Sequence, residues 1–320
     1  MRLYSVIIPV YNRPDEVNEL LQSLTRQTYK EFEVLVIEDG SSTRCNKVIE
    51  KYSDRLSITY YYKPNSGQGF SRNFGFERAK GDFFVVFDSD CIIPDHYFHT
   101  VDEYLNKHQL DAYGGPDKAH SNFTAMQKAI SYTMTSAFTT GGIRGGKKRM
   151  GAFHPRSFNM GISRAVFEET KGYKITRMGE DIEFSIRIIE AGFKTGLIAD
   201  AYVYHKRRTS LNQFYEQVHF FGRARINLSR FYPKEIKLVH SFPALFTLAF
   251  ILMWLLLVIS LDLFFIAVTL FGVFFFMLFC DALIKEKSLK VALLSMVTAF
   301  TQLIGYGIGF LTEGWRRIVK

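Results

Sequence analysis

The stretch YSVIIPVYNRPDE, residues 4–16, indicates how the chain begins to fold. Its first seven residues form an unbroken apolar run, rich in β-branched residues, which is typical of a strand covered on both faces. Pro14 then suits the first turn of a helix, and Asp15 lies near the positive end of that helix dipole. A buried strand followed at once by a helix is the first half of a parallel β–α–β unit.

The same alternation continues to residue 105. Further strands are predicted at residues 32–37, 57–62 and 83–87, and helices at residues 14–24, 44–52, 71–79 and 94–105. Strands that alternate with helices in this way predict an α/β domain with a mostly parallel central sheet and right-handed crossovers.

Charged residues are distributed unevenly along the chain. Residues 241–320 contain only 10 of the 71 charged side chains. Three uncharged stretches occur there, at residues 241–261, 263–280 and 291–312. Each has about 18 residues or more, which is enough for a helix to cross a hydrocarbon core of about 30 Å. A wholly soluble protein is therefore excluded, and the hydrophobic content of 48% excludes a disordered one.

These patterns predict three regions. Residues 1–209 form the α/β domain, residues 210–240 an amphipathic helix at the membrane interface, and residues 241–320 a transmembrane region of about three helices. Two alternatives stay open. The second region could be a core-packing helix, and the glycine-rich third stretch could be a re-entrant or interfacial segment that does not cross.

The net charge is +9, and basic residues cluster beside the predicted membrane region. Anionic lipid headgroups explain this cluster better than nucleic acid does, so we expect no nucleic-acid partner. The first nine residues lack the pattern of a signal peptide, and three widely spaced cysteines suit a reducing compartment. We therefore expect a multi-pass protein of the cytoplasmic membrane whose first domain faces the cytosol.

Polar residues follow each predicted strand, at the edge where parallel sheets bind ligands. Tyr11 follows the first strand, Asp39 the second, Asn65 the third, and Asp88 and Asp90 the fourth. Any one of these stretches could be an ordinary turn. Four of them at one sheet edge predict a ligand site.

Asp88 and Asp90 carry the clearest chemistry. Two carboxylates after an apolar strand supply the hard oxygen ligands that Mg²⁺ or Mn²⁺ prefers, and such ions share their remaining positions with phosphates. A D-x-D tripeptide alone is common, but its place at a strand end favours a metal site. The sequence contains neither the phosphate loop of ATPases nor the dinucleotide fingerprint, so those classes are not indicated.

Six motifs together resemble family 2 glycosyltransferases with the GT-A fold. They are SVIIPVYNRPDEVNELLQSLTRQTYKEFEVLVIEDGSS (residues 5–42), NSGQGFSRNFG (65–75), FFVVFDSDC (83–91), FNMGISR (158–164), MGEDIEFSIRIIEAGF (178–193) and YVYH (202–205). The resemblance implies inverting transfer from a nucleotide-diphosphate sugar, with a UDP-sugar as the expected donor. The acceptor would be lipid-linked or a surface glycan, as in membrane-attached bacterial enzymes that build exopolysaccharide.

The resemblance also implies roles for individual residues on the donor side. Asp39 would hold the nucleotide base, with Pro9 and Tyr11 lining that pocket. Arg72 would help to anchor the nucleotide, and Asp88 would face the ribose and the diphosphate.

Metal and catalytic roles follow from the same resemblance. Asp90, with Asp88 beside it, would bind a Mn or Mg cation, and His205 would complete the site, although a lone histidine is more often structural. Glu180 and Asp181 match the acidic pair of the family, with Asp181 as the general base for the acceptor hydroxyl. Acids at the start of a helix can also be simple dipole partners.

On the acceptor side, the resemblance points to Asn159, Gln217 and Arg223. The sequence after Gln217 departs from the usual Arg-Trp continuation, which argues against a processive cellulose- or chitin-type synthase.

The basic, glycine-rich residues 139–156 would form a mobile lid or a plain solvated loop. Its cations, which would meet donor phosphates or an anionic acceptor, are Arg144, Lys147, Lys148 and Arg149.

Two other functions stay open at this point. One is a polyprenyl-phosphate sugar synthase, whose acceptor is a lipid phosphate. The other is a non-catalytic membrane scaffold that binds nucleotide sugars. The intact Asp88, Asp90 and Asp181 argue against the scaffold, because a decayed enzyme would be expected to lose one of them.

Overall fold

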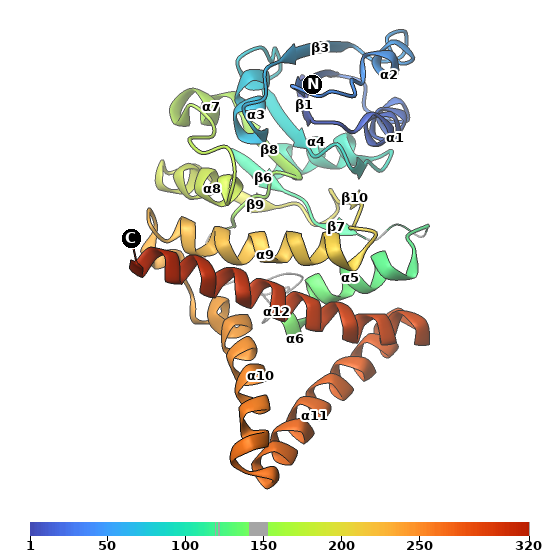
Figure 1. The fold of residues 1–320 in the computed structure, drawn as a ribbon. Coiled ribbons are helices and arrows are strands. Elements are labelled where there is room, and N and C mark those ends of the chain that lie inside the picture. Colours follow the sequence, from blue (N-terminus) through green and yellow to red (C-terminus); the bar gives the residue numbers. More distant parts are fainter. Residues whose placement is uncertain (119, 121, 141–152, 320) are drawn as a thin grey trace. The chain divides into compact units, whose positions relative to one another are not determined.

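A computed structural model of the chain describes residues 1–118, 120, 122–140 and 153–319 (Figure 1). The chain divides into two compact units, Met1–His120 with Met150–Lys206 and Ser121–Arg149 with Arg207–Lys320. Each unit has its own hydrophobic clusters. The cations of the predicted lid, Arg144, Lys147, Lys148 and Arg149, lie outside the described residues.

The first unit is built on a seven-stranded sheet in the order β3-β2-β1-β4-β8-β6-β9. Its strands are β1 (Tyr4–Val10), β2 (Phe32–Asp39), β3 (Ile58–Lys63), β4 (Phe83–Phe87), β6 (Ala112–Gly114), β8 (Asn159–Ser163) and β9 (Thr195–Leu197). The first four strands are parallel, whereas β8 runs antiparallel to β4 and β6. A small second sheet contains β5 (Cys91–Ile92), β7 (Asp117–Lys118) and β10 (Val203–His205). The predicted, mostly parallel sheet is confirmed.

Helices cover both faces of the large sheet (Figure 1). One face packs against α1 (Pro14–Thr25), α2 (Asn46–Glu50) and α4 (Tyr97–His108), and the other against α3 (Gln68–Phe76), α7 (Arg164–Thr170) and α8 (Glu180–Glu190). Along β1, Val6 and Ile8 belong to one core and Ile7 to the other. This alternation explains why the strand is apolar at nearly every position.

The start of α3 differs from the prediction. The helix begins at Gln68, earlier than the predicted residue 71. Gly67 turns the chain with a φ of 88°, which favours glycine. The backbone N–H groups of Ser66 and Gly67 bind the carboxylate of Asp39, so the helix start is held against the end of β2.

The second unit is helical in its described part. Its elements are α5 (Ala125–Thr135), α6 (Ala137–Thr140), α9 (Leu211–Leu228), η1 (Pro233–Glu235), η2 (Leu238–Ser241), α10 (Phe242–Ile259), α11 (Leu261–Glu286) and α12 (Leu289–Val319). Three segments, Leu238–Ile259, Leu261–Glu286 and Leu289–Val319, are long and apolar enough to cross a membrane. The predicted C-terminal apolar helices are therefore present.

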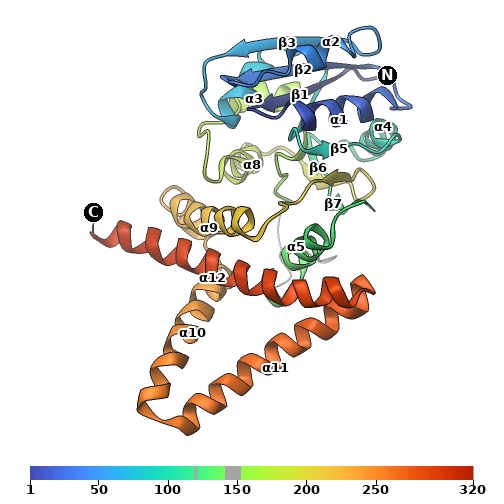
Figure 2. The same cartoon turned by 45° about the vertical axis from the view of Figure 1, so that its right-hand side comes forward.

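α9 and α12 lie side by side in both views (Figures 1 and 2), and glycines bring their backbones together. A Cβ atom at Gly222 of α9 would lie 2.1 Å from the carbonyl oxygen of Tyr306. One at Gly309 of α12 would lie 2.1 Å from the carbonyl oxygen of His219. No larger residue fits at either position without separating the helices.

α5 packs within the second unit, which the sequence pattern does not indicate. Tyr132 donates a hydrogen bond to Asp281 of α11 at 2.6 Å, and the hydroxyls of Thr133 and Thr298 of α12 lie 2.7 Å apart. These partners are 149 and 165 residues apart in the chain, so no local pattern could reveal the contact.

The contact between β6 and β8 generates a stability prediction. Tyr113 pairs with Gly161 across the strands, and a Cβ atom at Gly161 would lie 2.0 Å from Cε1 of Tyr113. Tyr113 is fully buried, so its ring has no room to move away. We expect Gly161→Ala to lower the free energy of unfolding by about 1–3 kcal/mol, the usual range for overpacking. Urea denaturation of the detergent-solubilised protein measures this loss.

Gly314→Ala is the matched control. A Cβ atom at Gly314 meets nothing within 4 Å, and alanine favours a helix more than glycine does. Equal losses of stability in the two variants would contradict the packing argument.

Candidate functional site

The carboxyl ends of β2 and β3 bring two opposite charges together. Asp39 ends β2 and is paired in register with Lys63, which ends β3. The Lys63 ammonium contacts the Asp39 carboxylate, which also accepts the N–H groups of Ser66 and Gly67 at 2.9 Å each. Burial alone would raise the pKa of Asp39, but the hydrogen bonds from Lys63 and Ser66 outweigh it and hold the pKa below its ordinary value. Asp39 is therefore a fixed, ionised carboxylate.

Pro9 and Tyr11, predicted to line the same pocket, lie at the end of the neighbouring strand. Pro9 pairs in register with Ile37, two residues before Asp39. Tyr11 follows β1 and is 54% exposed, so its ring is available to a ligand.

Arg72 lies on α3 and joins two parts of the site. Its side chain has no exposed surface. It donates to Asp88 Oδ1 at 2.8 Å and to Glu180 Oε1 at 3.3 Å. Arg72, the predicted nucleotide anchor, therefore pairs with two carboxylates of the site. Asp88 keeps a side-chain exposure of 32% and faces solvent beyond this ion pair.

The acidic pair begins α8, and its two members have different surroundings. Glu180 is buried and accepts hydrogen bonds from Gln68 and Arg72. Burial, followed by the charge of Asp181, raises the pKa of Glu180, and Arg72 opposes that rise. Asp181 is more exposed, at 19% of its side chain, and its Oδ2 lies 3.0 Å from Nη1 of Arg156. Of the pair, Asp181 is the better placed to meet a ligand.

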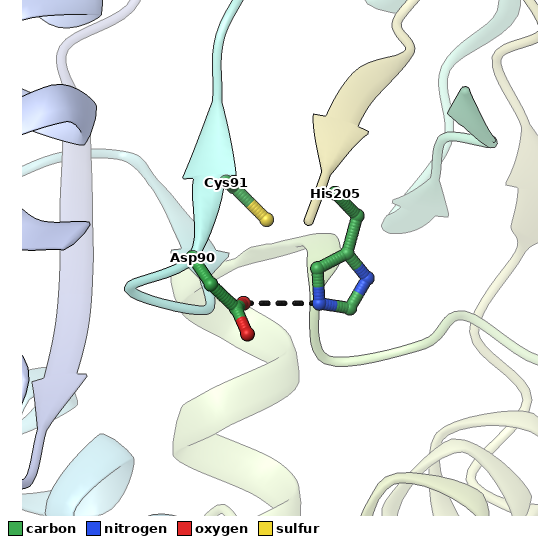
Figure 3. Close-up of side chains that lie close together, drawn as sticks. All are labelled: Asp90, Cys91 and His205. Atoms are coloured by element: carbon green, nitrogen blue, oxygen red, sulfur yellow. Dashed lines mark ion pairs between the residues drawn. The ribbon is translucent and has the colours of Figure 1, made fainter. Parts of the chain in front are cut away.

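Asp90, Cys91 and His205 form a cluster with metal-ligating atoms (Figure 3). One atom from each lies within 4.8 Å of the others, and Oδ1 of Asp90 is 3.0 Å from Nε2 of His205. The register between β5 and β10, which pairs Cys91 with His205, explains this proximity. On its other oxygen, Asp90 accepts a hydrogen bond from Arg13 at 2.9 Å.

The donor set of this cluster fits a hard divalent cation. Burial raises the pKa of the Cys91 thiol well above its ordinary value. The carboxylate of Asp90 and the imidazole of His205 offer the oxygen and nitrogen donors that suit Mn²⁺. Phe158 stacks on the His205 ring at a centroid distance of 5.1 Å and fixes its plane.

The three predicted acceptor-side residues are divided between the two units. Asn159 starts β8 and is fully buried, with its amide group bound to Tyr97 and to the carbonyl of Ala201. Gln217 and Arg223 lie on α9 of the second unit, where Arg223 forms an ion pair with Glu313 at 3.0 Å.

Side chains that were not predicted contact the carboxylates of the site, among them those of Arg13, Lys63, Gln68 and Arg156. The register of parallel strands could have identified Lys63, because it ends the strand beside Asp39. Gln68 shares one face of α3 with Arg72, at the helical spacing of four residues. Arg13 and Arg156 precede a helix and a strand, and no sequence pattern marks them.

Comparison with known proteins places this geometry in a family. The family model described as glycosyl transferase family 2 matches residues 5–170 of the sequence. An uncharacterized glycosyltransferase of Rickettsia typhi is 37% identical over 106 residues, which are 33% of this chain and 32% of that protein. The poly(ribitol-phosphate) β-N-acetylglucosaminyltransferase TarS of Staphylococcus aureus is 32% identical over 115 residues, 35% of this chain and 20% of TarS. The chain thus spans a third or less of the length of these relatives.

Solved structures share the fold. The mannosyltransferase PcManGT from Pyrobaculum calidifontis, determined in complex with GDP-Man and Mn²⁺, superposes with a TM-score of 0.61 and 14% identity. The alignment covers 99% of this chain and 88% of PcManGT. The expected GT-A-like fold is thereby confirmed. Since the family match also extends over more than half of the 320 residues, the chain belongs to glycosyl transferase family 2.

Proposed function

We propose that the protein is a metal-dependent, inverting glycosyltransferase of the cytoplasmic membrane. It transfers a sugar from a nucleotide-diphosphate sugar, with a UDP-sugar as the expected donor, to a lipid-linked or surface-glycan acceptor. Its first unit faces the cytosol, where nucleotide sugars are made. The observation that carries the proposal is the contrast between buried Glu180 and the more exposed Asp181 at the start of α8.

Asp181 is the proposed general base. It takes the proton of the acceptor hydroxyl while that oxygen attacks the anomeric carbon and the bond to the nucleotide diphosphate breaks. A single displacement with one base inverts the anomeric configuration. Arg156 orients the Asp181 carboxylate, and Gln68 with Arg72 holds Glu180 behind it.

Donor binding is assigned to the edge of the parallel sheet. Asp39 binds the nucleotide base between Pro9 and Tyr11, and Asp88 faces the ribose and the diphosphate. A divalent cation held by Asp90 and His205 would neutralise the charge of the departing diphosphate. The Mn²⁺ and GDP-Man of the PcManGT complex support the cation and the donor class. Asn159, Gln217 and Arg223 remain the proposed acceptor-side residues.

One assay separates the candidate functions. Purified protein is incubated with a panel of labelled nucleotide sugars and a membrane lipid extract, and the lipid products are identified by mass. An extended lipid-linked glycan supports the proposal, whereas a glycosyl monophosphate lipid would identify a polyprenyl-phosphate sugar synthase. Nucleotide-sugar binding without any turnover would identify a scaffold.

The role of Asp181 is tested by Asp181→Asn, which removes the base and keeps the shape. We expect turnover to fall by at least about 100-fold, the lower range for general base catalysis, with unchanged donor affinity. Glu190→Gln, at the exposed end of the same helix, is the matched control and should keep normal turnover. Near-normal turnover of Asp181→Asn, or a product of retained configuration, would reject the mechanism.

The cation site is tested by Asp90→Asn. We expect the affinity for Mn²⁺ to fall at least about tenfold, because removing even a residue that only hydrogen-bonds to a metal ligand lowers metal affinity by about that factor. The electron paramagnetic resonance signal of free Mn²⁺ measures this change without an activity assay. Asp95→Asn, at an exposed carboxylate paired with Arg26, should bind Mn²⁺ as the unsubstituted protein does. Unaltered binding in Asp90→Asn, or full activity in excess chelator, would contradict the assignment.

Lys63→Met generates a prediction about pH. The lowered pKa of Asp39 keeps its carboxylate ionised, and so able to accept a hydrogen bond from a base, down to acidic pH. Without the Lys63 ammonium the effect of burial dominates, the pKa of Asp39 rises, and the carboxylate becomes protonated at a higher pH. We expect the acidic loss of UDP affinity, measured by calorimetry, to move to higher pH. Lys51→Met, at an exposed lysine after α2, is the control, and an identical pH profile for both variants would refute the role of Lys63.

A further inference from the structure

α10 and α11 form an apolar hairpin with little cover. Only 6% of the most apolar window of α11 and 28% of that of Leu238–Ile259, which contains α10, are buried within the structure, compared with 50% for α12. Aromatic rings join the two helices, with Phe246 and Phe271 at a centroid distance of 5.2 Å. Ser260 joins the two helices, and the exposed Asp262 lies in the first turn of α11. A pair of this kind can cross a bilayer and return.

Both open ends of this hairpin contact α12. α12 starts at Leu289, directly after α11 ends at Glu286. The start of α10 lies against the middle of α12, because a Cβ atom at Gly307 would be 2.4 Å from the carbonyl oxygen of Pro243. Figures 1 and 2 show α12 running across the open end of the α10–α11 hairpin.

This geometry constrains the path of α12. Two antiparallel helices that cross a membrane begin and end on the same side of it. The stretch of α12 between its two contacts with the hairpin is about 27 Å long at 1.5 Å per residue. It therefore joins two points on one membrane face, and a helix that does so runs along that face.

The two faces of α12 agree with such a position. Ser295, Thr298 and Gln302 are buried on the side that packs within the unit. Large apolar residues are exposed on the other side, namely Leu293, Val297, Trp315 and Ile318. A helix that exposes an apolar face with a tryptophan suits the boundary between headgroups and acyl chains.

α9 gives a second reason, because it lies against α12 backbone to backbone. If α12 crossed the bilayer, the helix in contact with it would carry Arg223 and Arg225 towards the hydrocarbon, where charged side chains are strongly disfavoured. Arg223, Arg230 and Arg316 all lie within 4 Å of the Glu313 carboxylate, at 3.0, 3.5 and 3.8 Å. This basic cluster suits anionic headgroups rather than a lipid core.

We infer that α12 lies in the plane of the membrane at the headgroup boundary of an anionic bilayer, and that only α10 and α11 cross. The inference rests on the proposed membrane attachment and goes beyond it by assigning the surface that meets the lipid. Basic residues at both ends of α12 then lie on one side, as the positive-inside rule prefers. They are Lys285, Lys287, Lys290, Arg316 and Arg317. Three crossings would instead place the two arginines on the opposite side.

Cysteine labelling of the full chain in membrane vesicles tests this topology. The background carries Cys280→Ala, because Cys45 and Cys91 are buried and Cys280 is less so. Single cysteines are introduced at exposed positions as Lys237→Cys, Asp262→Cys and Arg316→Cys, and Arg317→Cys repeats the last measurement. A membrane-impermeant maleimide is applied to sealed right-side-out and inverted vesicles.

We expect Arg316→Cys and Lys237→Cys to be labelled in inverted vesicles and Asp262→Cys in right-side-out vesicles. Labelling of Arg316→Cys together with Asp262→Cys would overturn the in-plane position of α12 while leaving the membrane attachment intact. Recovery of the protein in the soluble fraction would instead refute the proposed attachment and, with it, the basis of this inference.

Discussion

Burying a guanidinium is unfavourable unless nearby carboxylates match its charge, and the side chain of Arg72 has no exposed surface. Asp88, at the edge of the sheet, and Glu180, at the start of α8, supply that match. Loss of either carboxylate would leave part of a buried charge uncompensated. The ion pairs of Arg72 therefore stabilise the first unit, and they also fix the distance between the end of β4 and the start of α8 in the site.

α3 extends the same constraint to the segment that leads into the acidic pair. Asn73 exchanges two hydrogen bonds of 2.8 Å with the backbone of Tyr173, and the N–H of Gly69 donates to the carbonyl of Thr176 at 3.3 Å. The turn before α3 binds Asp39 through its own backbone N–H groups. One short helix thus supports both the carboxylate proposed to hold the base and the loop before the proposed general base. The residues proposed to bind the donor and the residue proposed to activate the acceptor therefore both depend on the position of α3.

The sequence reveals those parts of the molecule in which local pattern and burial coincide. Because both faces of the sheet are covered, a buried strand such as Tyr4–Val10 is apolar at nearly every position and can be recognised from that run. The parallel order of the strands can be predicted from their alternation with helices. Contacts between distant segments behave differently. Arg13 reaches Asp90 and Arg156 reaches Asp181 through long side chains outside any periodic pattern, so only the folded chain identifies them. The packing of α5 on α11 and α12 is hidden for the same reason, since polar groups far apart in the chain form it.

The glycine contacts between α9 and α12 have a consequence for the choice of acceptor. At Gly222 and Gly309 backbone lies against backbone, so no flexible side chain at these two positions can absorb a shift of one helix relative to the other. If α12 rests at the headgroup boundary, α9 stands at a set height above it, and so do Gln217 and Arg223. If these two residues meet the acceptor, as proposed, the fixed spacing of the helix pair would favour an acceptor whose reactive group lies at the matching distance from its lipid anchor over longer or shorter ones.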